Sequence, residues 1–352
     1  MKIALDAMGG DRAPIETVKG AILALEEFQN LKLILVGQID KIEEELSKYK
    51  YDSTRIEIKN ATEVIEMDEE PASAVRGKKD SSMNVALDLV KNEEADASVS
   101  AGNTGALITA SQLKLKRIKG ILRPAIAAVF PTKTGHMVLL DAGANADCRP
   151  EFLDHFAILG SKYAEIALEI KNPRVGLLNI GSEEGKGNEL TRDAYEILKA
   201  QKDINFIGNI EPHKMMEGNV DVLVTDGYTG NIVLKTAEGM AKFVVEFLKH
   251  EIKSSFLAKI GALFLINVFS KMRKKMDSSE YGGAIFLGLN HISVKAHGGS
   301  DAKAIKNAIK AAMKFVEADF VEKVKEEIDK IEKAKAIVKE NEEQIKGETN
   351  EI

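Results

Sequence analysis

The chain has 352 residues, of which 44% are hydrophobic and 30% charged, and this balance excludes a disordered chain. Its formal net charge of −6 argues against a nucleic-acid-binding protein, because such proteins need a basic surface to displace counterions. The single cysteine, Cys148, excludes an internal disulfide and a CxxC metal site. With no signal peptide and no apolar run of about 18 residues, the sequence predicts a cytoplasmic protein without a membrane span.

Short runs of Val, Ile and Leu alternate with amphipathic stretches of helical period. Strands are predicted at Ile3–Asp6, Leu31–Val36, Arg55–Lys59, Ala97–Ser100, Ala125–Phe130, Met137–Asp141, Val175–Asn179, Asn205–Gly208, Val222–Thr225 and Ile292–Lys295. Helices are predicted between them at Pro14–Phe28, Ser82–Asn92, Thr104–Leu115, Pro150–Leu168 and Glu189–Ala200. This alternation predicts a three-layer α/β/α, Rossmann-like fold with a mostly parallel sheet, whose loops at the strand C-terminal ends gather along one edge.

The composition changes in two places, and these changes set the expected organisation. Residues 247–276 are apolar and basic, and a charged helix with an apolar stripe at Phe320, Val324, Ile328, Ile331 and Val338 follows from about Glu317. We expect one catalytic α/β domain over 1–316 that includes the 247–276 segment, a C-terminal helix over 317–340, and an acidic tail over 341–352.

Five predicted strand ends run into turns that contain glycine. Glycine lets the backbone approach a ligand, and the following helix offers free N–H groups and the positive end of its dipole. A single turn of this kind is often only turn and capping chemistry. Five together predict a site for a phosphate-like anion, with these candidate residues: Asp6, Gly9, Gly10, Ser100, Gly102, Asn103, Thr104, Gly105, Asp141, Asn145, Asp226, Thr229, Gly230, His297 and Gly298.

Known nucleotide motifs are missing from these turns. No G-x-G-x-x-G follows a strand, and Gly181–Gly187 departs from the P-loop spacing and has no hydroxyl after Lys186. Lys186 is either a cation directed at an anion or a solvated lysine beside Glu183 and Glu184. The histidines show no metal-ligand spacing, and nothing in the sequence marks a base for Cys148. We therefore expect neither cofactor nor metal, and a bound anion that is itself the nucleophile.

Several of these segments together resemble the motifs of the bacterial phosphate acyltransferase (PlsX) family. The resemblance runs in order from Met1 to about Val321 and is carried by these segments: Asp6–Asp11, Ser100–Ala106, Pro173–Asn179, Lys186–Leu190, Thr225–Asn231, Tyr281–Ala284 and Lys295–Gly298. It implies a homodimer with a fold similar to phosphotransacetylase and the isocitrate and isopropylmalate dehydrogenases, and a protruding helical hairpin.

The resemblance also implies the reaction. A long-chain acyl group moves reversibly from acyl carrier protein to inorganic phosphate, and the acyl phosphate passes to a membrane glycerol-3-phosphate acyltransferase for phosphatidic acid and phospholipid synthesis. By motif, Lys186 and Asn231 are the catalytic positions. They suit hydrogen-bond donation to the tetrahedral intermediate, while backbone N–H groups at Gly102–Gly105 would hold the phosphate.

The apolar-basic segment admits more than one interpretation. Residues 256–269 are too short to span a bilayer and lead into the basic run 271–276, which suits a helix lying on an anionic membrane surface. A dimer-packing hairpin fits the residues equally well, and the basic run could instead dock the acidic carrier protein. The resemblance favours a peripheral membrane segment with Leu257, Ile260, Leu263, Phe264 and Phe269 at its apolar face.

Three rival functions fit the sequence less well. An acyl-CoA-dependent phosphotransacetylase would not need the 256–276 segment, and a non-catalytic lipid-binding scaffold would not need Lys186 and Asn231. A metal-dependent decarboxylating dehydrogenase would need a carboxylate cluster for magnesium.

Overall fold

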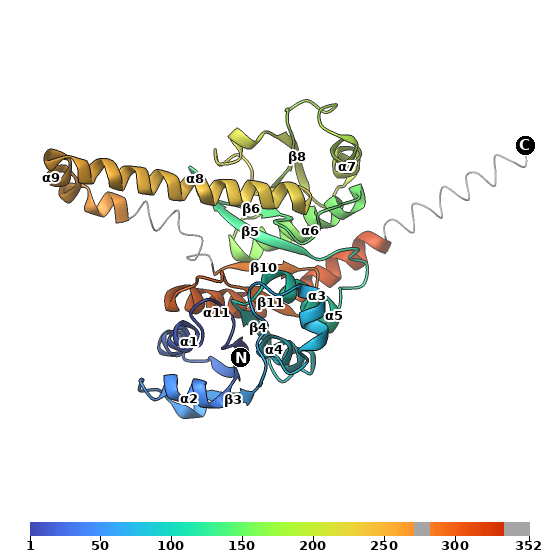
Figure 1. The fold of residues 1–352 in the computed structure, drawn as a ribbon. Coiled ribbons are helices and arrows are strands. Elements are labelled where there is room, and N and C mark those ends of the chain that lie inside the picture. Colours follow the sequence, from blue (N-terminus) through green and yellow to red (C-terminus); the bar gives the residue numbers. More distant parts are fainter. Residues whose placement is uncertain (271–281, 334–352) are drawn as a thin grey trace, which may run out of the picture.

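A computed structural model describes residues 1–270 and 282–333, and in it a single sheet runs through two lobes (Figure 1). The basic run 271–276, Tyr281 of the motif at 281–284, Val338 of the apolar stripe, and the acidic tail 341–352 lie outside the described residues.

The sheet has 11 strands in the order β3-β2-β1-β4-β11-β10-β5-β6-β9-β7-β8. Their bounds are β1 Lys2–Asp6, β2 Lys32–Gly37, β3 Ile56–Asn60, β4 Ala97–Ser100, β5 Ala125–Pro131, β6 His136–Leu140, β7 Arg174–Leu178, β8 Asn205–Ile210, β9 Val222–Val224, β10 Ala284–Leu287 and β11 Ile292–Lys295. All the expected strands are present within a residue or two at their ends. β10 was not expected.

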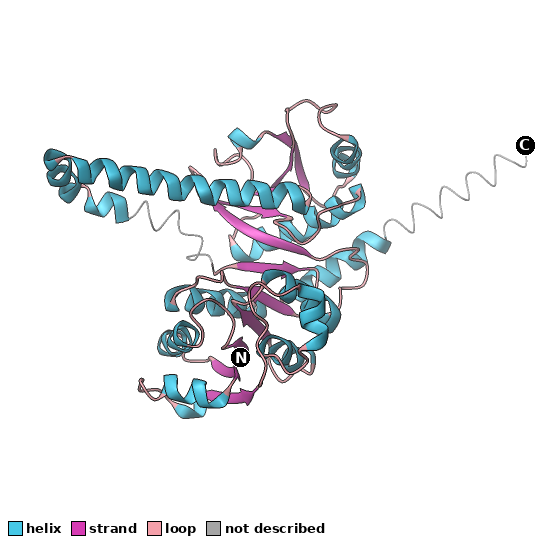
Figure 2. Cartoon of the chain, in the orientation of Figure 1, coloured by secondary structure: helices cyan, strands magenta, loops and turns pink. Residues whose placement is uncertain are grey.

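Helices lie on both faces of the sheet (Figure 2). They are α1 Ile15–Glu27, α2 Ile39–Leu46, α3 Pro71–Gly77, α4 Ser82–Lys91, α5 Thr104–Leu115, α6 Pro150–Ala167, α7 Glu189–Ala200, α8 Gly227–Ser254, α9 Phe256–Phe264 and α11 Ala302–Glu317, with short 3-10 turns at Ser53–Arg55 and Pro212–Lys214. Side chains of Ser81, Asn103, Asn188, Asp226 and Asp301 cap α4, α5, α7, α8 and α11 by accepting hydrogen bonds from first-turn N–H groups.

The core is divided by the sheet into two apolar clusters. Along β1, Ile3 and Leu5 join the cluster that contains α1, α6 and α11, whereas Ala4 joins the cluster with α4 and α5. Successive strand residues point to opposite faces, so a strand covered on both sides is apolar throughout. This arrangement confirms the three-layer α/β/α fold.

The strands do not all run in one direction, which corrects the expectation of a single edge for all the turns. β10 is antiparallel to both β11 and β5, and β5 is antiparallel to β6. β6, β9 and β7 are parallel to one another, so they run opposite to β1, β4 and β11. The turns after β6 and β9 therefore leave the sheet in the opposite direction to the turns after β1, β4 and β11.

The register nevertheless brings the two sets of turns together. Lys295, the last residue of β11, lies opposite Ala284 of β10. Ile285 lies opposite Ala127, and the next residue of β5, Ala128, lies opposite Leu139. Since Leu140 ends β6, the ends of β6 and β11 lie at levels that differ by about one residue, or roughly 3 Å. The two halves are staggered, and their strand C-terminal ends face one another over β10 and β5.

Helices α8 and α9 form an arm that leaves the body of the protein (Figure 1). α8 has 28 residues, a length of about 42 Å, and it has no buried residue after Gly230. α9 has no buried residue, and the exposed fractions of Leu263 and Phe264 are 69% and 84%. The arm is the expected helical hairpin. In the described ranges, none of the helices combines the length and apolar character that a transmembrane span needs.

The C-terminal residues 320–333 are helical. Phe320, Val324, Ile328 and Ile331 are buried, and Phe320 packs edge-on against Phe315 of α11 with ring centroids 5.1 Å apart. The described part of the predicted apolar stripe is therefore confirmed as a core-facing surface.

Candidate active site

Three of the glycine-bearing turns, those after β1, β4 and β11, pack on one another. The buried Asp6 carboxylate accepts hydrogen bonds from the Ser100 hydroxyl at 2.6 Å and from the Met8 N–H at 3.2 Å. The Asp11 N–H donates to the Gly298 carbonyl at 2.9 Å. Gly10 has φ +110°, and an added Cβ would lie only 3.0 Å from the Gly298 oxygen. Asp6 and Gly10 thus fix the relative positions of these turns.

The turn after β4 leaves two N–H groups open at the start of α5. The Gly102 N–H donates to the Ser100 hydroxyl at 3.1 Å, and the Ala106 N–H donates to the Asn103 side chain at 3.0 Å. The Asn103 amide in turn donates to the Met67 carbonyl at 3.0 Å. In the part of the chain that the structure describes, the N–H groups of Thr104 and Gly105 have no hydrogen-bond partner. They are the groups that a bound anion would satisfy.

The other two turns, after β6 and β9, are organised around Asp141. Its buried carboxylate accepts hydrogen bonds from the N–H groups of Ile126, Gly143 and Ala144 and from both the N–H and the side chain of Asn145. The Gly227 N–H donates to the Asn145 carbonyl at 2.8 Å, which joins the two turns.

The start of α8 lies directly against the Asp141 turn. Asp226 caps α8 by accepting from both the N–H and the hydroxyl of Thr229. A Cβ on Gly230 would come within 1.9 Å of the Asp141 carbonyl oxygen, so only glycine fits there. A Cβ on Gly143 would lie 3.4 Å from the Asn231 side chain. Asp141 therefore sets the position from which Asn231 projects.

The two groups of turns meet at one cavity of about 380 Å³ between the lobes, called the central cavity below. Residues from both groups line it: Thr104, Ala142, Gly143, Asn231, Leu234, Lys235, Glu238, Gly283, Ala284, Lys295, Ala296, His297, Ser300 and Ala304, with Ile126, Ala128 and Val129 of β5. The structure thus brings Thr104, Asn231 and His297 together from three separate segments of the sequence.

The central cavity is suited to an anion because the first turns of three helices reach it. Thr104 begins α5, Asn231 follows the start of α8, and Ser300 and Ala304 flank the start of α11. Each helix start carries partial positive charge. The His297 Nδ1 accepts from the Gly299 N–H at 3.1 Å, while its side chain is exposed in the cavity wall.

Lys295 adds a buried cation to this wall. Only 7% of it is exposed, and its ammonium donates to the carbonyls of Ala101, at 3.4 Å, and of Ala296. Burial lowers the pKa of Lys295 to about 8, and the neighbouring Asp6 and Asp11 carboxylates oppose that shift. Burial also raises the pKa of Asp6, against the hydrogen bond from Ser100. A buried lysine in the wall of a cavity can bind an anion strongly, because little water screens its charge.

One candidate from the sequence lies elsewhere, whereas Cys148 lies beside the Asp141 turn, where its Sγ donates to the Asn145 carbonyl at 3.6 Å. Lys186 does not line the central cavity; its side chain is 52% exposed, and its ammonium lies 4.0 Å from Glu183. It belongs to the loop after β7, the neighbour of β9 in the sheet. Burial raises the pKa of Cys148 to about 12, so its thiol is protonated at neutral pH and unsuited to nucleophilic attack.

The sequence also contains signals for residues of the central cavity that are absent from the predicted site. Lys295 ends a short strand whose other residues, Ile292, Ser293 and Val294, are apolar or small and are buried. A lysine at the end of such a strand is a candidate for a buried charge. Leu234, Lys235 and Glu238 follow Asn231 at helical spacing, so they share its face of α8.

Comparisons with known proteins bear on this site. The model of the family described as "Fatty acid synthesis protein" matches residues 1–323. A phosphate acyltransferase from Fusobacterium nucleatum is 62% identical over 330 residues, which cover 94% of this chain and 99% of that protein. A phosphate acyltransferase from Clostridium perfringens is 52% identical over 330 residues, which cover 94% of this chain and 97% of that protein.

Solved structures are similar in fold. A phosphotransacetylase from Streptococcus pyogenes superimposes with a TM-score of 0.61 at 20% identity, over 90% of this chain and 94% of that one. A phosphotransacetylase from Staphylococcus aureus gives a TM-score of 0.59 at 16% identity, over 89% of this chain and 94% of that one.

Proposed function

This chain belongs to the fatty acid synthesis protein family and is a phosphate acyltransferase, and from that premise we propose that it transfers a long-chain acyl group reversibly from acyl carrier protein to inorganic phosphate. The observation that carries the proposal is the central cavity, where three helix starts, Lys295 and Asn231 surround a space of about 380 Å³. Such a space suits phosphate and the reacting carbonyl.

Phosphate binds in this proposal at the start of α5. The free N–H groups of Thr104 and Gly105 and the Lys295 ammonium neutralise its charge and hold one oxygen toward the thioester. That oxygen forms a bond to the carbonyl carbon, and the carbonyl electron pair moves onto its oxygen. The Asn231 amide donates to this oxyanion, with Lys186 as a second donor from the loop after β7. Collapse of the intermediate expels the carrier thiolate, which takes up a proton.

The other predicted residues support these groups. Asp6, Ser100 and Gly9 order the turns around the phosphate, and Asp141, Asn145 and Gly230 hold Asn231 in place. Because one sheet crosses both lobes, residues 1–316 are proposed to act as one catalytic unit without a cofactor or metal.

The acyl donor is tested by following phosphate-dependent release of free acyl carrier protein from its palmitoyl form. We expect turnover with this donor to exceed turnover with acetyl-CoA, and we expect acyl phosphate to form in equal amount. Activity with acetyl-CoA and none with the carrier thioester would reject the proposed donor in favour of a coenzyme A thioester.

The arm α8–α9 is proposed to rest on an anionic membrane surface, where the acyl phosphate passes to a glycerol-3-phosphate acyltransferase for phosphatidic acid synthesis. Phe256, Leu257 and Phe264 are 76%, 78% and 84% exposed at its end, far from both lobes in Figure 1. An apolar tip of this kind is stabilised when it enters the interface between headgroups and acyl chains.

Along α8, Phe243 and Phe247 are also exposed and stack with ring centroids 6.0 Å apart. They are proposed to pack against a second copy in a homodimer.

Replacing Phe264 with glutamate is expected to abolish flotation with vesicles that contain anionic lipid. The side chain is exposed, so the charge removes the gain from insertion without disturbing the fold. Phe247→Glu, in the shaft of the same arm, is the matched control: it should weaken the dimer in light scattering and retain more vesicle binding. Unchanged flotation of folded Phe264→Glu would rule out the membrane role, and loss of the dimer in that variant would assign the tip to the dimer interface.

A further inference from the structure

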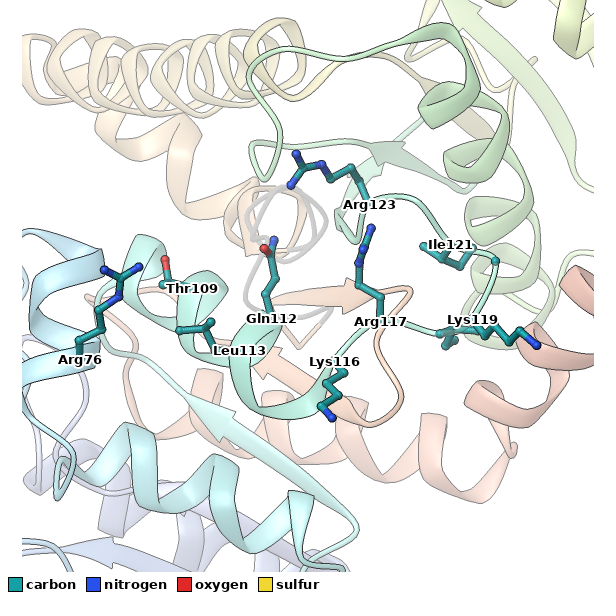
Figure 3. A pocket seen from close by; sticks show the side chains of 11 residues that line it. Arg76, Thr109, Gln112, Leu113, Lys116, Arg117, Lys119, Ile121 and Arg123 are labelled. Atoms are coloured by element: carbon teal, nitrogen blue, oxygen red, sulfur yellow. The ribbon is translucent and has the colours of Figure 1, made fainter.

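A second cavity, of about 650 Å³, lies at the C-terminal end of α5 and is called the basic pocket below (Figure 3). Its wall comes from α3, α5 and the loop that leads to β5. It is lined by Arg76, Thr109, Gln112, Leu113, Lys116, Arg117, Ile118, Lys119, Gly120, Ile121 and Arg123. An adjoining cavity of about 500 Å³ shares Arg117 and Arg123 and adds Arg149. The chain as a whole carries a net charge of −6, so this concentration of cations is local.

Most of these cations have no acidic partner. Within residues 1–270 and 282–333, no ion pair joins Arg76, Lys116 or Lys119 to a carboxylate. The Arg117 guanidinium donates to the Leu122 carbonyl, and Arg149 lies 3.9 Å from Glu151. Two acids approach the pocket in the described ranges: Glu332 beside Gly120, and Glu70, whose pKa is lowered by hydrogen bonds from Ser73 and Ala72 and by the charge of Arg76. The cations of the two adjoining cavities outnumber these acids, so the pocket presents an excess of positive charge.

The shape and composition of the basic pocket favour a folded protein as its ligand. Leu113 is 56% exposed and lies among Arg76, Gln112 and Lys116 in Figure 3. An apolar centre ringed by cations is the usual form of a protein–protein contact with an acidic partner. In Figure 1, α5 and the apolar tip at α9 lie on opposite sides of the molecule, so a membrane that meets the tip does not meet this pocket.

Helix α5 connects the basic pocket to the central cavity. Its first residue, Thr104, lines the central cavity, while Gln112 lines the basic pocket eight residues later, a distance of about 12 Å along the helix. Gln112 and Ala144 also line one small cavity, and Ala144 directly follows Ala142 and Gly143 of the central cavity in the sequence. A partner seated at the basic pocket therefore lies within reach of the central cavity through a short flexible arm.

We propose that the basic pocket is the docking site for the acidic face of the acyl carrier protein. This inference rests on the proposed function, in which that carrier delivers the thioester. Lys116, Lys119 and Arg76 pair with carboxylates on the carrier, Leu113 packs against an apolar side chain between them, and α5 sets the distance from the docked carrier to the phosphate. The pocket selects the carrier and takes no part in the bond changes.

The double variant Lys116→Glu/Lys119→Glu tests the inference, because both side chains are exposed and neither makes an ion pair within the described ranges. With palmitoyl carrier as donor, KM is expected to rise roughly tenfold with kcat unchanged, and KM should depend less on salt. Leu113→Ala should raise the same KM. The matched control is Lys41→Glu/Lys50→Glu, which makes the same charge change in and after α2, away from α5 (Figure 1).

Each result has one meaning. An unchanged KM in the double variant, with a wild-type enzyme active on the carrier, overturns the docking site and leaves the proposed function standing. A wild-type enzyme that acts only on acyl-CoA rejects the proposed function itself. An equal rise in KM for acyl-CoA would show that the pocket binds small anionic donors, and loss of vesicle flotation would assign it to the membrane; either result overturns the inference. An equal rise in KM in the α2 control would show that the effect comes from the total charge of the protein and not from the basic pocket, and this too would overturn the inference.

Discussion

Replacing Asn231 with alanine is expected to lower the turnover number by about 10²–10³-fold, the size of effect that loss of one oxyanion donor produces. Asn231 lies in the wall of the central cavity, and the Asp141 turn fixes its position through Gly230 and Gly143. Lys186→Ala is expected to have an effect of similar size. Lys186 lies in the loop after the neighbouring strand and is half exposed, so it must move toward the substrate to act.

The isosteric change Asn231→Asp separates hydrogen-bond donation from packing. It keeps the volume but replaces the donor with a charge of the same sign as the substrate, so turnover should fall at least as far as in the alanine variant. The thermal midpoint of all three variants should stay near that of the wild type, because neither side chain is buried in the core. Full turnover of Lys186→Ala would remove Lys186 from the mechanism and leave Asn231 as the single proposed side-chain donor.

Lys295→Met is expected to raise the KM for phosphate by at least about tenfold and, at the same time, to stabilise the protein at neutral pH. The ammonium is buried, and its pKa of about 8 lies below the usual lysine value. Since the unfolded chain binds that proton more tightly, the charge destabilises the folded protein by up to about 3 kcal/mol below pH 8. The cost declines as the pH rises from 8 toward 10.5, where lysine is neutral in both states.

Two pH profiles check this prediction. In the wild type, kcat/KM for phosphate should fall as the pH rises through about 8, because the cation that holds phosphate is lost. That fall should be absent in Lys295→Met. The gain in thermal midpoint of the variant should be largest near pH 7 and shrink toward pH 10. A variant with normal phosphate KM would give Lys295 a structural role only, and a variant less stable at pH 7 would contradict the burial argument.

The order of strands and helices could be predicted from the sequence because each element carries its own hydrophobic period, and several helices also carry a side-chain cap. Thr104–Leu115 and Glu189–Ala200 were found with their observed bounds, each preceded by an asparagine that caps the helix. β10 was missed for a local reason. Its four residues lie between Gly283 and Gly288, which have φ of +84° and +86°, so the segment looks like part of a loop.

The wrong edge has a separate cause. β10 pairs antiparallel with both neighbours, so β5 keeps the direction of β11, and the antiparallel pairing of β5 with β6 reverses the second half of the sheet. Pairing between distant strands leaves little trace in a local pattern, whereas alternation within one strand does. The turns were found as separate anion sites, but the stagger that makes them face each other follows from the register of β10 and β5.

The candidate site could be predicted only in part, because some of its residues have a local signal in the sequence and others depend on contacts between distant segments. Glycine, asparagine and threonine after a strand identify Thr104 and Asn231 because these residue types have a local meaning. Lys295 was passed over because a lysine is ordinarily exposed, and its burial depends on Ala101 and Asp6 from other strands. Whether Lys186 reaches the substrate depends on the conformation of a loop, which residue spacing does not specify.

The uninterrupted helix α8 has a practical consequence for anyone who wishes to shorten this protein for crystallisation. Asn231 and Glu238, which line the central cavity, belong to the same 28-residue helix as the shaft of the arm, which ends at Ser254. The exposed apolar arm could be deleted to improve solubility. If the deletion begins too close to Glu238, it also removes the helical turns that keep the cavity-lining part of α8 helical. A deletion should therefore keep Gly227–Glu238 and at least one further turn, and end in a helix-stopping glycine.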